Sequence, residues 1–309
     1  MDSFFHSTIS FDAEWQTLFS FIKSLGCLGV DIFLFVSGIS LYFSMMKNGE
    51  NKKQFYIRRL QRVWLPSLLV SIPWFLAIDI YKGGGVGSFI LSTTGLALFV
   101  NGNRTIWFVS VISFCYVLYP WVYNLLKKHK WSAKVLLVIL SVNIIINIVL
   151  RFVFPIFWTN TEIFWRRIPI FIIGAYVGKI VYEKKKIDVS SLYIIAITIA
   201  LTVVYYFISR YMIEYQRYLF IPLAISYTSL FSCIGNCKVL QKVGTWFAPI
   251  TLEIYLTHEK IIIVVTKLFP MFNDIVINLT ALLCSVICAY VLLRIEKIIL
   301  CLLSKKNVL

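Results

Sequence analysis

The sequence predicts an all-α, polytopic membrane protein, a helix bundle with about nine spanning helices. Hydrophobic residues make up 60% of the 309 residues and charged residues only 14%, whereas soluble domains average roughly 45–50% apolar and about 25% charged residues. Apolar runs long enough to cross a bilayer recur along the whole chain. We see no internal repeat and no soluble domain, and we therefore expect a single membrane-embedded domain over residues 1–309.

The hydropathy pattern places each spanning helix. The predicted spans are residues 28–46, 63–80, 106–126, 135–154, 164–182, 189–208, 217–235, 246–267 and 275–301. Residues 83–100, GGGVGSFILSTTGLALFV, are short and interrupted by glycine, and they predict a loop with a re-entrant or interfacial segment. Aromatic residues make up 17% of the chain, and Tyr and Trp are typical of the two membrane interfaces.

The distribution of positive charge predicts the orientation in the membrane. A net charge of +16 in a soluble chain would suggest nucleic acid, but in a membrane protein basic residues concentrate in cytoplasmic loops. If the loop 47–62 is cytoplasmic, roughly two thirds of the 30 Lys and Arg residues fall on the cytoplasmic side. We therefore expect a cytoplasmic C-terminus, residues 1–27 outside, membrane lipid as a partner and no nucleic acid.

Asp31 is the first ionisable residue within a predicted span. It lies one turn inside the apolar stretch CLGVDIFLFVSGISLYFS at 27–44. Ionisable groups within the lipid layer are costly and are functional candidates for that reason. The alternative is an interfacial carboxylate that the dipole of the helix N-terminus favours.

Small residues predict a close helix contact. Ser37 and Gly38 would let another helix approach closely, and Gly174 and Gly178, four residues apart, would form a similar seam on a second helix.

A basic cluster stands where the predicted cytoplasmic loop enters the next span, in QFYIRRLQRVWLPSLL at 54–69. It contains Arg58, Arg59 and Arg62, of which the last two are three residues apart and share a helix face. Guanidinium groups bind phosphate oxygens bidentately, so the pair suits a ligand with several phosphates. The alternatives are a topology signal and binding of anionic lipid headgroups.

Charged residues also gather at the predicted outer ends of two spans. Arg104 and Trp107 begin one of them, and Glu162 and Arg166, four residues apart, can pair near the start of the other. The functional interpretation is charge pairing at the mouth of a water-filled cavity. The alternatives are an aromatic anchor with core packing for the first pair and a solvated rim pair for the second.

The late span carries TLEIYLTHEKIIIVV at 251–265, with His258 near its middle and Glu253, Glu259 and Lys260 close by. Three ionisable groups near a helix centre indicate function, although a buried His can also be a satisfied core residue. No Cys or His spacing typical of zinc sites occurs, so we expect no metal.

Together these stretches resemble the acyltransferase 3 family of integral-membrane acyltransferases, which typically has ten membrane helices. The resemblance depends on five stretches in the family's order rather than on any one of them. These are GVDIFLFVSG (29–38), FYIRRLQRVWLP (55–66), TIWFVSVISFCYVLYP (105–120), RIPIFIIGAYVGK (167–179) and TLEIYLTH (251–258).

One feature departs from the family. Its members begin with a helix that carries an Arg and ends in a functional His, and His6, 23 residues before Gly29, matches that His. Here Met1 lies only five residues before His6. We expect either a start site further upstream or a truncated homologue.

The resemblance implies an integral-membrane acyltransferase, an O-acetyltransferase by expectation, in the bacterial cytoplasmic (inner) membrane. Acetyl-CoA or another acyl-CoA would be the cytoplasmic co-substrate, without a tightly bound cofactor. The acceptor would be a hydroxyl of an extracytoplasmic glycan or lipid-linked saccharide. The alternatives are a polysaccharide transporter or flippase and an inactive, truncated membrane homologue.

The resemblance also implies residue roles. An imidazole can take the proton of a hydroxyl, and a carboxylate can orient that imidazole. The predicted catalytic residues are His6, Asp31 and His258; those for acyl-CoA are Arg58, Arg59 and Arg62; those for the outer substrate site are Arg104, Trp107, Glu162 and Arg166.

Overall fold

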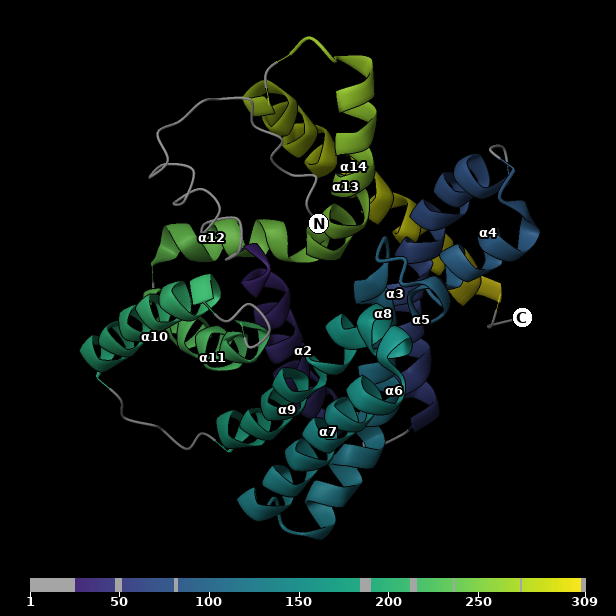
Figure 1. The fold of residues 1–309 in the computed structure, drawn as a ribbon. Helices are drawn as coiled ribbons and strands as arrows, with labels where there is room; N and C mark the ends of the chain where they lie inside the picture. Colours follow the sequence, from purple (N-terminus) through teal and green to yellow (C-terminus); the bar gives the residue numbers. More distant parts are fainter. Residues whose placement is uncertain are drawn as a thin grey trace. The chain divides into compact units, whose positions relative to one another are not determined.

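The computed structural model describes residues 26–47, 52–80, 83–183, 190–211, 216–235, 237–272 and 274–306. All regular secondary structure in these ranges is helical (Figure 1), which confirms the predicted all-α fold. The elements are α2 (Leu28–Lys47), α3 (Lys52–Phe75), the π-helix η1 (Leu76–Ile80), α4 (Gly85–Thr94), α5 (Ala97–Asn101), α6 (Trp107–Lys128), α7 (Ala133–Val153), α8 (Pro155–Trp165), α9 (Ile168–Tyr182), α10 (Ser191–Tyr211), α11 (Gln216–Ile234), α12 (Lys238–Phe247), the 3-10 helix η2 (Ala248–Ile250), α13 (Thr251–Leu268) and α14 (Asp274–Lys306).

Within the described residues, seven helices are long and apolar enough to cross a membrane, and each coincides with a predicted span. They are Leu28–Lys47, Lys53–Ile80, Trp107–Lys128, Ala133–Val153, Ser191–Ile208, Arg217–Ile234 and Val276–Leu302. The other two predicted spans, 164–182 and 246–267, are also helical but are shorter or more charged. Residues 83–100, predicted as a loop with a re-entrant or interfacial segment, contain the short helix α4 and most of α5.

A proline, Pro169, explains why the predicted span 164–182 is divided. Pro169 lies in the first turn of α9, where its missing N–H costs nothing, but in a continuous helix its ring would clash with the carbonyl of Trp165. Helix α8 accordingly ends at Trp165, and the chain turns through Arg166 and Arg167 before α9 begins. This leaves α9 with only 15 residues.

The charges of α13 explain the second difference. Glu253, Glu259, Lys260 and Lys267 all lie within its 18 residues. Removal of several charges from water is expensive, so composition alone does not mark this helix as a span.

The described helices form two compact units. One, the α2/α9 unit, comprises the described residues of 12–58 and 97–240; the other, the α13/α14 unit, comprises those of 59–96 and 241–309. In the α13/α14 unit, Ile262 and Val265 of α13 pack on Ile277 and Ala281 of α14.

Helices α2 and α9 pack side by side with their backbones in contact (Figure 1). A Cβ atom placed at Gly38 would overlap the carbonyl oxygen of Phe171, and one placed at Gly174 would overlap that of Phe35. Hydrogen is therefore the only side chain that fits at either position. The close contact predicted from Gly38 and Gly174 is confirmed.

The contacts also show that α2 and α9 run parallel. At the far end of the seam, a Cβ atom at Gly178 would lie 2.8 Å from Cβ of Tyr42. The ring centroids of Tyr42 and Tyr182 are 5.6 Å apart, and those of Tyr42 and Trp131 are 5.1 Å apart. Later residues of α2 thus meet later residues of α9, so both helices begin at the same end of the unit.

Replacing Gly174 with Ala should destabilise the α2/α9 contact, because the new methyl group would overlap the backbone of α2. Overpacking of this kind costs about 1–3 kcal/mol, so the thermal unfolding midpoint of the detergent-purified protein should fall. Gly29→Ala, on α2 with no heavy atom within 4 Å of the added Cβ, is the matched control. Equal midpoints for the two variants would contradict the seam.

Candidate functional site

The segment before α6 holds Arg104 and Trp107 in place. The Asn103 Oδ1 atom accepts hydrogen bonds from the Thr105 backbone N–H at 3.0 Å and from the Thr105 hydroxyl at 2.7 Å. Gly102 adopts a left-handed conformation, with φ at +74°, which glycine adopts at no steric cost. This turn places Arg104 just before α6 and Trp107 as the first residue of that helix.

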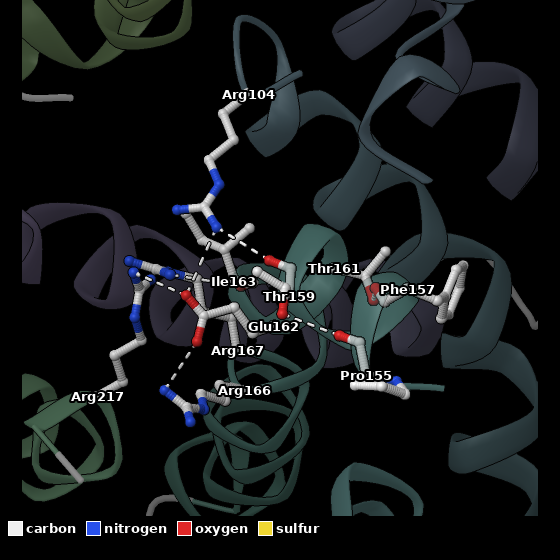
Figure 2. A network of polar contacts seen from close by, with 10 residues as sticks. All are labelled: Arg104, Pro155, Phe157, Thr159, Thr161, Glu162, Ile163, Arg166, Arg167 and Arg217. Carbon is white, nitrogen blue, oxygen red and sulfur yellow. Dashed lines mark hydrogen bonds and ion pairs between the residues drawn. The ribbon is translucent and has the colours of Figure 1, made fainter. Parts of the chain in front are cut away.

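Glu162 of α8 is surrounded by three arginines (Figure 2). Its Oε2 atom lies 3.1 Å from Nη1 of Arg166. Its Oε1 atom lies 3.5 Å from Nη2 of Arg104 and 3.5 Å from Nη2 of Arg217 at the start of α11. Arg104 also donates a hydrogen bond to the Thr159 carbonyl at 3.2 Å. The predicted pairing of Glu162 with Arg166 is confirmed, and the structure adds Arg104 and Arg217 to it.

Arg167 and Asp31 form a second, deeply buried ion pair. The Arg167 Nε and Asp31 Oδ1 atoms are 3.5 Å apart, and each residue is only 3% exposed. The Arg167 guanidinium carbon lies 4.6 Å from the ring centroid of Trp107, and Nη1 donates a hydrogen bond to the Ile163 carbonyl at 3.4 Å. Arg167 therefore links α2, α6 and α8 at the point where α9 begins.

These two ion-pair groups, which we call the arginine cluster, carry more positive than negative charge. Its members are Arg104, Arg166, Arg167 and Arg217 with Glu162 and Asp31. Guanidinium groups do not lose their protons in proteins, and buried charge is costly unless it is paired. Four cations against two carboxylates suit a site that receives an anion.

Asp31 retains one oxygen for another partner. Among the described residues, its Oδ2 atom is buried without a hydrogen-bond partner. The prediction that Asp31 orients an imidazole concerned His6, which lies outside the described residues. The structure does describe the other oxygen, Oδ1, which is paired with Arg167.

A pocket of about 490 Å³ lies beside the arginine cluster. Apolar residues of α7 form one side, and Asn147, Arg151, Trp158, Arg166 and Tyr218 complete the lining. Arg166 thus belongs to both the cluster and the pocket wall.

The predicted acyl-CoA arginines all lie on α3. Arg58 is exposed, and its Nη2 atom donates a hydrogen bond to Gln54 Oε1 at 3.2 Å. Arg59 and Arg62 belong to the α13/α14 unit. The exposed Arg62 interacts electrostatically with Glu253 and Glu296, both buried in that unit.

His258 lies on α13, in the α13/α14 unit. Its Nδ1 atom is 3.1 Å from the Ile254 carbonyl, and its ring centroid is 5.7 Å from that of Tyr255. Lys260 of the same helix is buried, and its Nζ atom lies 6.0 Å from the ring centroid of Trp74. Among the described residues no group of three or more His, Cys, Asp or Glu side chains could hold a metal ion.

Comparison with protein families matches residues 2–294 to the acyltransferase 3 family, described as an acyltransferase domain. The chain belongs to this family. It is a membrane acyltransferase, with apolar helices that can span a bilayer. Comparison with curated proteins and with solved structures gives no match.

Two arginines of this acyltransferase's cluster are not among the predicted site residues. Arg217 stands at the start of a span, where a single basic residue indicates only topology. Arg167 follows Arg166 in a stretch that resembles the family, and no acidic residue lies four positions before or after it. Asp31 could have indicated this ion pair, because a carboxylate within a span is costly unless a cation pairs with it.

Replacing Arg167 with Met should strongly destabilise the enzyme, because it leaves the Asp31 carboxylate buried without its cation. Loss of one partner of a buried ion pair costs about 3–5 kcal/mol, whereas Arg104→Met, at a side chain 40% exposed, should cost at most about 1 kcal/mol. Thermal unfolding midpoints measure both. The Asp31→Asn, Arg167→Met double variant should regain part of the loss, and a double variant no more stable than Arg167→Met would contradict this role.

Proposed function

We propose that this enzyme transfers an acyl group, most simply acetyl, from cytoplasmic acyl-CoA to a hydroxyl of an extracytoplasmic glycan or lipid-linked saccharide. The observation that carries the proposal is the arginine cluster, with four guanidiniums gathered on two carboxylates where α2, α6, α9 and α11 begin. The charge bias of the loops predicts that this end lies at the outer face. An acceptor would therefore meet the cluster from outside.

The basic start of α3 supports a donor site at a different depth. Within the α2/α9 unit, the Tyr56 hydroxyl donates a hydrogen bond to the Val117 carbonyl at 3.3 Å, and the ring centroids of Phe55 and Tyr119 are 5.9 Å apart. Val117 lies ten residues after Trp107 on α6, or about 15 Å along the helix. This contact lies near the middle of α6. We propose that acyl-CoA reaches it from the cytoplasmic side and that Arg58, Arg59 and Arg62 hold its phosphates.

The transfer itself needs a general base. The acceptor hydroxyl would lose its proton to an imidazole as its oxygen attacks the thioester carbonyl carbon. The C–S bond then breaks, and the proton passes to the departing CoA thiolate. We assign the imidazole to His6, with His258 as a second catalytic candidate, and we assign to Asp31 Oδ2 the task of orienting it.

The test measures acetyl transfer from labelled acetyl-CoA to glycan and lipid-linked saccharide acceptors in membranes that contain the enzyme. The Arg59→Gln, Arg62→Gln double variant should raise KM for acetyl-CoA about tenfold or more, because each lost charge-assisted hydrogen bond weakens phosphate binding. His6→Ala should instead lower kcat by about 10²–10⁴-fold, the usual contribution of a general base.

Two matched controls accompany these variants. Lys134→Gln removes a positive charge from the exposed start of α7, and His129→Ala removes an exposed imidazole at the end of α6; both should transfer acetyl like the wild type. Unchanged KM in the arginine variant, or movement of saccharide across the membrane without consumption of acetyl-CoA, would contradict the proposal.

A further inference from the structure

The pocket beside the arginine cluster combines an apolar side with a cationic and aromatic side. Ile144, Ile148 and Phe152 of α7 form the apolar side. Their side chains are 45%, 51% and 79% exposed, so protein atoms leave much of this surface uncovered. The volume of the pocket, about 490 Å³, falls in the range of small-molecule sites, about 300–1,000 Å³.

Arg166 is held rigidly at the inner wall of the pocket. Its guanidinium carbon lies 5.0 Å from the ring centroid of Trp158 and 5.6 Å from that of Tyr218. Its Nη1 atom is committed to Glu162 at 3.1 Å, and the residue is only 6% exposed. Its Nε atom is buried and has no hydrogen-bond partner among the described residues. A guanidinium that is held in a fixed plane and has an unused N–H can donate a hydrogen bond to an acceptor oxygen of a ligand.

A second guanidinium shares the same indole. The Arg151 guanidinium carbon lies 5.2 Å from the ring centroid of Trp158. Arg151 and Arg166 both line the pocket, so an anionic group within it would be attracted by both guanidiniums. Arg151 lies in the last turn of α7, where the helix dipole favours a cation.

Two further polar atoms of the pocket lining are unsatisfied. The Trp158 indole Nε1 and the Asn147 Oδ1 are buried without hydrogen-bond partners among the described residues. Asn147 is only 4% exposed, and its amide nitrogen donates to the Asn143 carbonyl at 3.0 Å. A buried polar atom without a partner costs about 1–3 kcal/mol, so these atoms, with Arg166 Nε, are consistent with a site that a polar ligand completes.

We propose that this pocket binds an acidic amphiphile, a phosphate ester of a hydrocarbon chain, with its phosphate between Arg151 and Arg166 and its chain along Ile144, Ile148 and Phe152. This proposal rests on the proposed function in one respect, because the amphiphile, with a saccharide on its phosphate, would be the lipid-linked acceptor whose sugar hydroxyl receives the acyl group. The acceptor would reach the arginine cluster along the surface of α7, directed by Arg166, which belongs to both.

The test measures binding of radiolabelled dodecyl phosphate to the purified chain in micelles of dodecyl maltoside, a neutral detergent. Arg151→Gln removes an exposed cation and should weaken binding about tenfold or more, because it removes a charge-assisted hydrogen bond to the phosphate. Lys134→Gln, the same change of charge at the other end of α7, should leave binding unchanged. Inorganic phosphate should compete only at far higher concentration, because it lacks the hydrocarbon chain.

Three results would overturn the proposal: equal affinity in Arg151→Gln and wild type, equal weakening in Lys134→Gln, or competition by inorganic phosphate as strong as by dodecyl phosphate. Gel filtration of each variant confirms that it remains folded. Acetyl-CoA turnover is measured on the same preparations. Binding that depends on Arg151 without acetyl-CoA turnover refutes the proposed function and supports the pocket, whereas turnover with binding that is independent of Arg151 does the reverse.

Discussion

The structure of the α2/α9 unit depends on one close contact, the backbone-to-backbone packing of α2 on α9. Gly38 and Gly174 permit this contact because any side chain at either position would enter the backbone of the other helix. Two parallel helices in such contact can slide little without a clash. Their fixed offset brings Asp31, near the start of α2, beside Arg167 at the start of α9, and the charged site is built from that point.

The arginine cluster follows from the electrostatics of buried and partly buried charges. Arg167 joins α2, α6 and α8 through Asp31, Trp107 and the Ile163 carbonyl. Glu162 then pairs with cations from the turn after α8, from the segment before α6 and from α11. Each carboxylate lowers the cost of burying guanidinium groups, but among the described residues the cluster has four arginines and only two carboxylates. The remaining positive charge supports the proposal that an anionic or hydroxyl-bearing ligand binds here.

Local patterns in the sequence predicted the parts of this arrangement that depend on neighbours along the chain. Hydropathy gave the seven long spans, glycine spacing gave the α2/α9 seam, and the i, i+4 spacing gave the pairing of Glu162 with Arg166. The pairing of Asp31 with Arg167 joins residues far apart in the chain, and no local rule selects it. Likewise, a hydropathy window averages over the break at Pro169, because the strongly apolar residues after it outweigh Arg166 and Arg167 before it.

The central proposal is that the arginine cluster opens on the outer face while acyl-CoA approaches the basic start of α3 from the cytoplasm, so that the acyl group crosses the bundle. Helix α6 joins the two sides, and its 22 residues span about 33 Å, enough for a hydrocarbon core of about 30 Å. The most direct measurement is labelling of Asn101→Cys and Lys128→Cys, which flank α6, with a membrane-impermeant maleimide, each against the labelling of the native cysteines in the wild type. We expect Asn101→Cys to react in intact cells and Lys128→Cys only in inside-out vesicles; reaction of both from the same side, or the reverse order, would contradict the claim.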